Sequence, residues 1–366
     1  MAGKYLAPGF RVSVDGSDLT LDLSLQVTRV SVKLAADGMD ECSLSLANPY
    51  PELPWTHGSQ KGLFTLGSGL KVQMGYVDKL KDLFDGEVTA MTVSFPEGGH
   101  AALEVQGKSR LHRLQASFGP FTYPNATDEA VVKKVAQRSS LGTKVDATEA
   151  TYATLTQGSS VSDLAFLRER ARLVGREMFV TGTTLNFVKP REAGGEAYTL
   201  VWGRTAKAFA SPGEYVPLLS FTPTSDAEAQ VSEVVVRWYD AATMKVIEGK
   251  AGKGAEAAQM GAETGGAAAV SAFGGARKLV VTDKAVATPA EAEAHAKARL
   301  NELEMNFIRG TGSSVGLPDL APGKVVKIDG VGPYFGGKYY VTQVTHVVST
   351  GGYRSDFTVR RNASGT

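Results

Sequence analysis

Short runs in which apolar and polar residues alternate dominate the N-terminal part of the chain. They lie at 10–14, 20–25, 27–34 and 41–46. Alternation with a period of two is typical of strands that bury one face. We therefore expect residues 1–115 to form a β module, and closure into a barrel would remove the exposed strand edges.

The C-terminal part has the same character. Three short segments there are rich in β-branched and aromatic residues, and turns with glycine separate them. They lie at 324–328, 339–348 and 357–360. This pattern predicts a meander of antiparallel strands. The glycine-punctuated run before it, 310–316, is interpreted as a loop that Pro318 closes.

The two β regions resemble one another along their sequences. Residues 69–72 parallel 323–326, 84–87 parallel 335–338, and 88–92 parallel 341–345. Each set continues through a Gly-Gly turn into a closing strand. Because the period is far longer than a solenoid repeat, we interpret the pattern as one β module used twice.

Between 116 and 198 the pattern changes to that of a small α+β domain. Apolar residues recur at helical spacing after Thr127 and again after Ser160. Both hydroxyls can cap a helix, so we predict one helix to about Ser140 and a second that Gly175 ends. Two strands joined at Gly182 are expected next, at 177–181 and 184–188.

A second β-barrel module is expected in two pieces, 199–248 and 279–366. Its first piece contains strand-like runs at 199–202, 218–223 and 231–239. In the second piece, Thr288-Pro289-Ala290-Glu291 combines a capping hydroxyl, a first-turn proline and a capping-box acid, which predicts a connecting helix over 289–306. The Gly/Ala-rich stretch between the pieces, 249–278, has no periodic apolar face and predicts a flexible surface excursion.

Composition narrows the function classes. The chain has 366 residues, 43% of them hydrophobic and 21% charged, which is ordinary for a globular protein. A net charge of +1 does not indicate a nucleic-acid partner. The single cysteine, Cys42, excludes an intrachain disulfide, and we expect it to be buried. There is no apolar run behind Lys4, so we expect no signal peptide, no membrane insertion, and assembly in the bacterial cytoplasm.

The residues that usually carry catalysis do not form a constellation. The histidines are scattered and lack metal-ligand spacing; they are His57, His100, His112, His295 and His346. The glycine run at 310–316 follows a predicted helix, whereas a dinucleotide fingerprint follows a strand. The sequence therefore predicts no catalytic, metal-binding or cofactor-binding residue, no cofactor, and no enzymatic activity.

Two blocks of the sequence resemble the phage late control protein D family. The first is QGSSVSDLAFL at 157–167, continuing to Gly175, and the second is GTGSSVGLPDLAPGKVVKIDGVG from Gly310, followed by FGGKYYVTQVTHVVSTGGYRSDFTVRRN from Phe335. Members of this family are baseplate hub proteins of contractile tails, and they are similar to the N-terminal half of VgrG spikes. The resemblance implies a mainly β fold with α+β: two related β-barrel (tube-like) modules plus a small α+β domain.

The resemblance also implies partners and a place in the particle. It implies a homotrimer whose six barrels form a ring, a symmetry adaptor between a hexameric tail tube and a trimeric spike. Other baseplate or tape-measure components are the further expected partners. VgrG proteins continue into an OB-fold and a needle, whereas this chain stops at Thr366, so a separate spike protein is expected.

Two other functions stay open from the sequence. One is a tail-tip peptidoglycan hydrolase. The other is a carbohydrate-binding β module with Trp55, Trp202 or Trp238 as the sugar platform. Large aromatics more often anchor cores and interfaces, so the structural hub is favoured.

Overall fold

The computed structural model describes residues 7–48, 64–76, 79–148, 150–203, 215–241, 243–255, 258–262 and 265–365. Within these ranges, no helix combines the length and apolar character that crossing a lipid bilayer needs.

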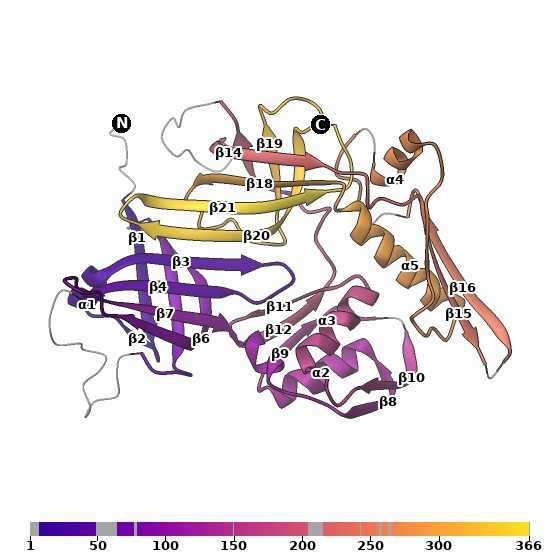
Figure 1. Cartoon of the computed structure of the whole chain (residues 1–366), viewed down its shortest axis with the longest axis horizontal. Helices are drawn as coiled ribbons and strands as arrows, with labels where there is room; N and C mark the ends of the chain where they lie inside the picture. The colour runs from indigo at the N-terminus through magenta and orange to yellow at the C-terminus, as the bar shows by residue number, and fades with distance from the viewer. Residues whose placement is uncertain are drawn as a thin grey trace.

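The first β module lies at the left of Figure 1. Its strands are β1 (Pro8–Val14), β2 (Ser17–Asp18), β3 (Val27–Ala35), β4 (Glu41–Asn48), β5 (Gly69–Tyr76), β6 (Lys79–Ser94) and β7 (Ala101–Ser109). The ladders run in the order β3-β4-β7-β6-β5-β1. Alternate residues such as Val30, Val32 and Leu44 are fully buried in one core, as the period-two pattern predicts.

The second β module lies above the first and carries the C-terminus (Figure 1). Its strands are β13 (Glu196–Val201), β14 (Val216–Ser225), β18 (Ile308–Val315), β19 (Val325–Asp329), β20 (Gly337–Ser349) and β21 (Gly352–Arg361). The order is β19-β13-β14-β18-β21-β20, and β19 also pairs with β20. These six strands therefore close into a barrel.

The two modules have the same strand order. From the first strand of each, the neighbours are β1-β5-β6-β7-β4-β3 and β13-β19-β20-β21-β18-β14. They differ in that β1 runs antiparallel to β5, whereas β13 runs parallel to β19. Within the described residues no ladder joins β1 to β3, as β13 joins β14. The predicted fold class, mainly β with two related β-barrel modules and a small α+β domain, is confirmed.

The α+β domain follows the first module and lies at the bottom centre of Figure 1. Its elements are η1 (Arg110–Gln115), β8 (Phe121–Thr127), α2 (Asp128–Arg138), β9 (Gly142–Val145), β10 (Thr151–Gln157), α3 (Asp163–Leu173), β11 (Glu177–Thr181) and β12 (Thr184–Val188). β11 and β12 have the predicted bounds. The side chain of Thr127 caps α2, as predicted, by accepting from the Ala130 N–H at 3.2 Å.

The second helix of this domain begins later than its sequence predicts. Ser162, rather than Ser160, caps α3, and its Oγ accepts from the Ala165 N–H at 3.2 Å. Ser159 and Ser160 form a turn before it, and Ser162 forms an antiparallel bridge with Phe118. The Asp163 N–H also donates to the Ser117 carbonyl at 2.8 Å.

A third unit projects at the right of Figure 1. Its elements are β15 (Glu233–Asp240), β16 (Lys245–Gly252), α4 (Gly266–Ala269), η2 (Val270–Phe273), β17 (Lys278–Val281) and α5 (Pro289–Glu304). The sequence places the strand at 231–239 in the second barrel, but β15 forms a separate sheet in the order β16-β15-β17. The small residues Ala292 and Ala296 of α5 pack on this sheet, so strand and helix approach closely.

Part of the predicted 249–278 excursion also belongs to ordered elements. It begins in β16 and includes α4, η2 and the start of β17. Two apolar side chains in it, Met260 and Val270, are buried. Met260 and Val270 are ten residues apart within a stretch of glycine and alanine, so they form no periodic apolar face that the sequence could show.

Two further sequence predictions are wrong. The alternating run 20–25 is not a strand: α1 (Leu21–Gln26) is a short helix that Thr20 caps. Leu21, Leu23 and Leu25 are spaced two residues apart, as on one face of a strand. Leu21 and Leu25 are also four residues apart, as on one face of a helix, so the run fits both periods. The glycine run at 310–316 is not a loop, because most of it is β18. A Cβ on Gly312 would lie 2.6 Å from the Phe357 ring, so its glycines make room for aromatic side chains of neighbouring strands.

Candidate functional site

The two barrels meet along one strand, β20. The second half of β20, residues 343–349, lies antiparallel to residues 35–29 of β3, and this pairing joins both modules into one sheet of thirteen strands. The Ala36 N–H donates to the Thr342 carbonyl at 2.9 Å at one end of the pairing. Main-chain hydrogen bonds therefore fix the barrels to each other within the chain (Figure 1).

A β-bulge marks the same place in both barrels. The register between β6 and β7 shifts between Val88 and Ala90, and that between β20 and β21 shifts between Val341 and Gln343. The extra residue is a threonine in each case. The Thr89 hydroxyl donates to the Gln106 carbonyl at 3.3 Å, and the Thr342 hydroxyl donates to the Thr358 carbonyl at 3.1 Å.

A second bulge also recurs. The β3–β4 register shifts around Thr28, and the β14–β18 register shifts around Leu219. From these bulges the ladders match residue by residue, so Val32 corresponds to Pro223, and Met91 corresponds to Val344. The predicted duplication of 88–92 and 341–345 holds at this level.

The other two predicted parallels are out of register by two residues. Gly69 lies opposite Glu87, and Val325 lies opposite Tyr340, the residue before Val341. Residues 69–72 therefore correspond to 325–328 rather than to 323–326. Identical residues, such as Gly69 with Gly323 and Phe84 with Phe335, made the shifted match look better in the sequence.

A buried polar cluster ties the second barrel to the α+β domain. The Tyr340 hydroxyl donates to Glu177 Oε2 at 2.7 Å, and the Arg360 guanidinium lies 3.8 Å from Glu177 and 4.0 Å from Glu192. Burial raises the pKa of Glu177 to about 7, although the Tyr340 hydrogen bond and Arg360 act against the rise. Since the carboxyl gains a proton more readily here than in water, this contact responds to pH.

His346 lies inside the second barrel, in contact with three neighbours. Its Nε2 lies 3.0 Å from the Leu320 carbonyl, and its Nδ1 lies 3.0 Å from both the Tyr353 and the Ser355 hydroxyl. A neutral ring that donates from Nε2 and accepts at Nδ1 satisfies all of these contacts. Burial lowers the pKa of His346 to about 4. The residue supports the barrel interior.

Two ion pairs lie inside the α+β domain, at the starts of its helices. Arg170 Nε donates to Asp128 Oδ1 at 2.6 Å, and Arg138 donates to Asp163 Oδ1 at 2.8 Å. Both carboxylate side chains are fully buried. Arg170 is itself buried, since the buried Asp128 carboxylate supplies the counter-charge that its guanidinium needs.

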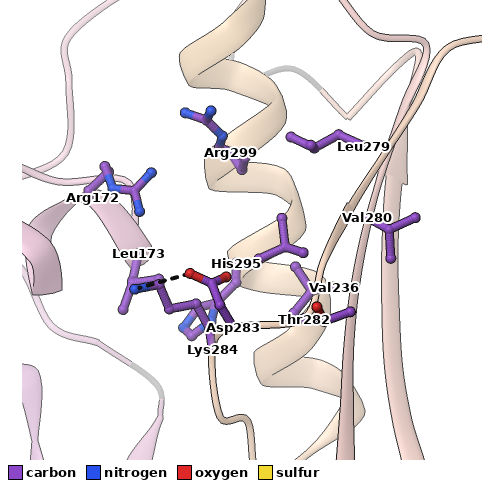
Figure 2. A pocket seen from close by; sticks show the side chains of 11 residues that line it. Arg172, Leu173, Val236, Leu279, Val280, Thr282, Asp283, Lys284, His295 and Arg299 are labelled. Carbon is purple, nitrogen blue, oxygen red and sulfur yellow. Dashed lines mark ion pairs between the residues drawn. The ribbon is translucent and has the colours of Figure 1, made fainter.

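A cavity of about 350 Å³ lies between α3, α5 and the β15–β17 sheet. Figure 2 shows Arg172, Lys284, Arg299 and His295 around it. Each cation already lies against a carboxylate: Lys284 against Glu169, and Arg172 and Arg299 against Glu302. Burial lowers the pKa of His295 to about 4. The charges around the cavity are therefore largely balanced before any ligand enters.

With this geometry established, comparison with known proteins identifies the family. A family model described as the Alg8 N-terminal domain matches residues 6–350. The chain belongs to this family. The match covers the first barrel, the domains between the barrels, and the second barrel as far as the end of β20. The resemblance to the late control protein D family stays a prediction.

Solved structures similar to this Alg8 N-terminal domain chain are phage tail proteins and a secretion-system component. The 43 kDa tail protein of prophage MuSo2 from Shewanella oneidensis has a TM-score of 0.70 at 12% identity, over 97% of this chain and 98% of that one. The tail protein from Neisseria meningitidis MC58 has a TM-score of 0.68 at 14% identity, over 97% and 96%.

The third is the E. coli c3393 protein, described as a component of the type VI secretion system with similarity to T4 tail proteins gp27 and gp5. It has a TM-score of 0.57 at 12% identity, over 96% of this chain and 77% of that one. The chain thus has the fold of phage tail proteins. No curated protein matches its sequence.

The residues weighed as candidate sites are dispersed. His112 binds Glu87 at 2.8 Å, His100 is exposed, and His295 and His346 are buried as described. His57 lies outside the described residues. Among the residues the structure describes, no group of three or more potential ligands could hold a metal ion. Cys42 is buried as predicted, which raises the pKa of its thiol.

The tryptophans do not gather at one surface either. Trp202 is half exposed after β13, and Trp238 packs partly against the core under α5. Trp55 lies outside the described residues.

The strand pairing between the barrels is the feature that sequence reasoning missed. One signal for it is present in the sequence. The run at 339–348 is longer than its hairpin partner at 324–328, so part of it needs another neighbour.

Proposed function

We propose that this chain is the central baseplate hub of a contractile tail or contractile injection system. In this proposal three copies form a trimeric symmetry adaptor that joins the hexameric tail tube to a trimeric spike. The tail-protein fold supports the proposal, and the observation that carries it is the repeat of strand order and bulges within one chain.

The physical reason is symmetry. A ring of three identical chains can meet a partner of sixfold symmetry only if each chain presents its contact surface twice. Two modules with the same strand order and the same bulges, held together by the β20–β3 pairing, supply two such surfaces in one polypeptide. A chain with one barrel would leave half of a sixfold partner without a matching contact.

The proposed partners and location follow from the same role. They are two further copies of this chain, the tail tube protein, a separate spike protein and other baseplate or tape-measure components. The chain would assemble in the bacterial cytoplasm and then stay in the tail of a phage-like particle, as a virion structural protein. Phage, tailocin and injection system share this architecture.

The first test is the oligomeric state and symmetry of the purified full chain. Native mass spectrometry should give three times the 38.6 kDa of one chain, and electron-microscopy class averages should show a ring with threefold and pseudo-sixfold symmetry. A chain that stays monomeric at every concentration, and also when mixed with its tube and spike proteins, contradicts the proposal.

We further propose that the chain is not an enzyme. Glu177 and His346, two of the groups with shifted pKa values, are satisfied by tyrosine and main-chain partners that build the fold. A zymogram on peptidoglycan with the purified chain tests this directly. A clearing zone that the matched buffer and a heat-denatured sample lack would favour the alternative of a tail-tip peptidoglycan hydrolase.

A further inference from the structure

One half of β6 has a neighbour on one side only. Residues 90–94 pair with β7, and the ladder with β5 ends at Glu87. The corresponding residues of β20, 343–347, pair with β21 on one side and with β3 on the other. Within the described part of the chain, the open edge of β6 (residues 90–94) lacks the neighbour that its counterpart has.

A matching open edge occurs on the second barrel. β14 is the counterpart of β3, but it meets β13 only at Val216 and Pro217. Residues 220–225 pair with β18 alone among the described residues, and we call them the open edge of β14. Each chain therefore contains one joint between barrels, the β20–β3 pairing. The open edges of β6 and β14 are the counterparts of β20 and β3, and among the described residues they do not pair with each other.

We infer that the open edge of β6 in one copy pairs antiparallel with the open edge of β14 in the next copy. This inference rests on the proposed hub function and names the contact that builds the ring. Internal joints and joints between copies then alternate around it. The contact is head-to-tail, and it forms a closed ring only because the chain's two barrels have equivalent ladders.

The exposure of apolar side chains supports this pairing. Met91 and Phe95 are 38% and 69% exposed, whereas their counterparts Val344 and Val348 are 0% and 6% exposed. Val348 packs in one core with Val30 of β3, its partner in the ladder, and Val344, opposite Leu34 of β3, packs in the core of the second barrel. Met91 and Phe95 lack that cover in a single chain, and a neighbouring strand would supply it.

The internal joint also fixes the register. Thr345 lies opposite Lys33, and Val348 lies opposite Val30. Transferred through the matching ladders, these pairs become Thr92 opposite Thr224 and Phe95 opposite Phe221 in the next copy. The first pair consists of two exposed threonines, and the second places two aromatic rings side by side.

Pro223 gives the open edge of β14 a distinct property. It lies opposite Gly310 in the β14–β18 ladder, so its nitrogen faces away from β18 and toward the open edge. Its counterpart in the internal joint is Val32, which has an N–H. The joint between copies therefore has one main-chain hydrogen bond fewer, and the proline discourages wrong strands from adding to this edge.

A disulfide across the joint tests the register. Ala36 donates to Thr342, so the alternate pairs of the internal joint, which include Thr345 and Lys33, are non-hydrogen-bonded. Such pairs have Cα atoms about 4.5 Å apart, which suits a disulfide. The variant Thr92→Cys/Thr224→Cys should form a covalent trimer on a non-reducing gel after mild oxidation. Native Cys42 is buried and does not compete.

The controls separate failure of the joint from failure of the hub proposal. Thr92→Cys/Ser220→Cys, four residues out of register, and each single variant should stay uncrosslinked. A trimer by native mass spectrometry that the in-register pair does not crosslink overturns the joint and leaves the hub function standing. A protein that is monomeric under all conditions overturns both.

A charge on the open edge gives a second readout. Met91→Lys should weaken trimer formation at least about tenfold, because a buried unpaired charge is strongly unfavourable. Met244→Lys, at a methionine that is 78% exposed in the β15–β16 turn, should leave the trimer unchanged. Circular dichroism of both variants checks that the single chains fold. Equal trimer affinity for the two variants contradicts the pairing.

Discussion

At the scale of single residues, the structure depends on a few polar side chains that each have a specific partner. The bulge threonines Thr89 and Thr342 satisfy a carbonyl of the neighbouring strand where the ladder is interrupted. Asp128 and Asp163 hold arginines at the helix starts of the α+β domain. Each of these groups would be costly to leave without its partner.

The Asp128–Arg170 pair should dominate the stability of the α+β domain. Arg170→Ala leaves a fully buried carboxylate without its cation and should lower the free energy of unfolding by about 3–5 kcal/mol. Arg172→Ala, which removes an exposed pair with Glu169, should change it by less than about 0.5 kcal/mol. Urea unfolding of both variants measures the difference, and equal midpoints would contradict the assignment.

Glu177 should make stability depend on pH. Its pKa is raised from 4.5 to about 7 in the folded chain, so between these values the folded state holds a proton that the unfolded state has lost. The contribution of this proton is present below about pH 4.5 and is lost as the pH rises through about 7.

Glu177→Gln should therefore reduce the fall in melting temperature between pH 5 and pH 8. The amide cannot lose a proton and can still accept from Tyr340. Glu97→Gln, at an exposed loop residue, is the matched control and should leave the pH profile unchanged. Asp40 has a raised pKa of about 7 for the same reason, so part of the slope should persist in Glu177→Gln.

At the scale of elements, β18 shows how glycine serves a strand. Gly310 and Gly312 lie under the rings of Phe221 and Phe357, which fill the space a side chain would take. Strands with several glycines are intrinsically weak, so the ladders with β14 and β21 must hold this one in place.

A methyl group at Gly312 should disturb the barrel. Its Cβ would lie 2.6 Å from the Phe357 ring and 2.9 Å from the Ser220 carbonyl oxygen, and the expected loss from such overpacking is about 1–3 kcal/mol. Gly275→Ala, at a site with no atom within 4 Å, should leave stability the same or slightly higher. Thermal unfolding of both variants decides, and an unchanged Gly312→Ala would show that the strand can move aside.

How far the sequence determines these elements depends on the range of the interactions that form them. Thr127 and Thr288 cap their helices as predicted, because capping involves residues three apart in the chain. The strands β11 and β12 have the predicted bounds because a tight turn separates them. The run at 20–25 and the glycine run at 310–316 were mispredicted, since neighbours distant in sequence decide both.

The same limit applies to the candidate site. The duplication was visible because the bulge segment, 88–92 and 341–345, repeats in the sequence itself. The β20–β3 pairing was not, because no local pattern shows which distant strand covers an edge. The available sign was that the run at 339–348 is longer than its hairpin partner at 324–328, and it becomes meaningful only once the ladders are known.

At the scale of the whole molecule, two equivalent barrels are held by one pairing and flanked by domains that differ. The α+β domain follows the first barrel, and the α5 unit is inserted into the second (Figure 1). Chains of the proposed trimer would thus repeat their barrels six times and their outer domains three times. The ring can be pseudo-sixfold at its barrels and threefold elsewhere.

Hydrogen exchange of the monomer and the trimer should separate the two kinds of joint. Amides at 90–94 and 220–225 should exchange more slowly after assembly, because they gain strand neighbours. Amides at 343–349 are already paired with β3 and β21, so their exchange should not change. Protection of all three segments to the same degree would show that assembly acts through general tightening rather than through these edges.

The shared strand β20 decides how such a ring yields under load. Where β20 pairs with β3, both barrels belong to one polypeptide, so the covalent chain also holds the contact together. No proline interrupts the paired residues of β3, so each of them has an N–H. The proposed contact between the open edges of β6 and β14 has neither advantage, because it joins two separate chains and includes Pro223, which has no N–H. A contracting tail that strained the ring would open it at three places, and each piece released would be an intact chain able to reassemble.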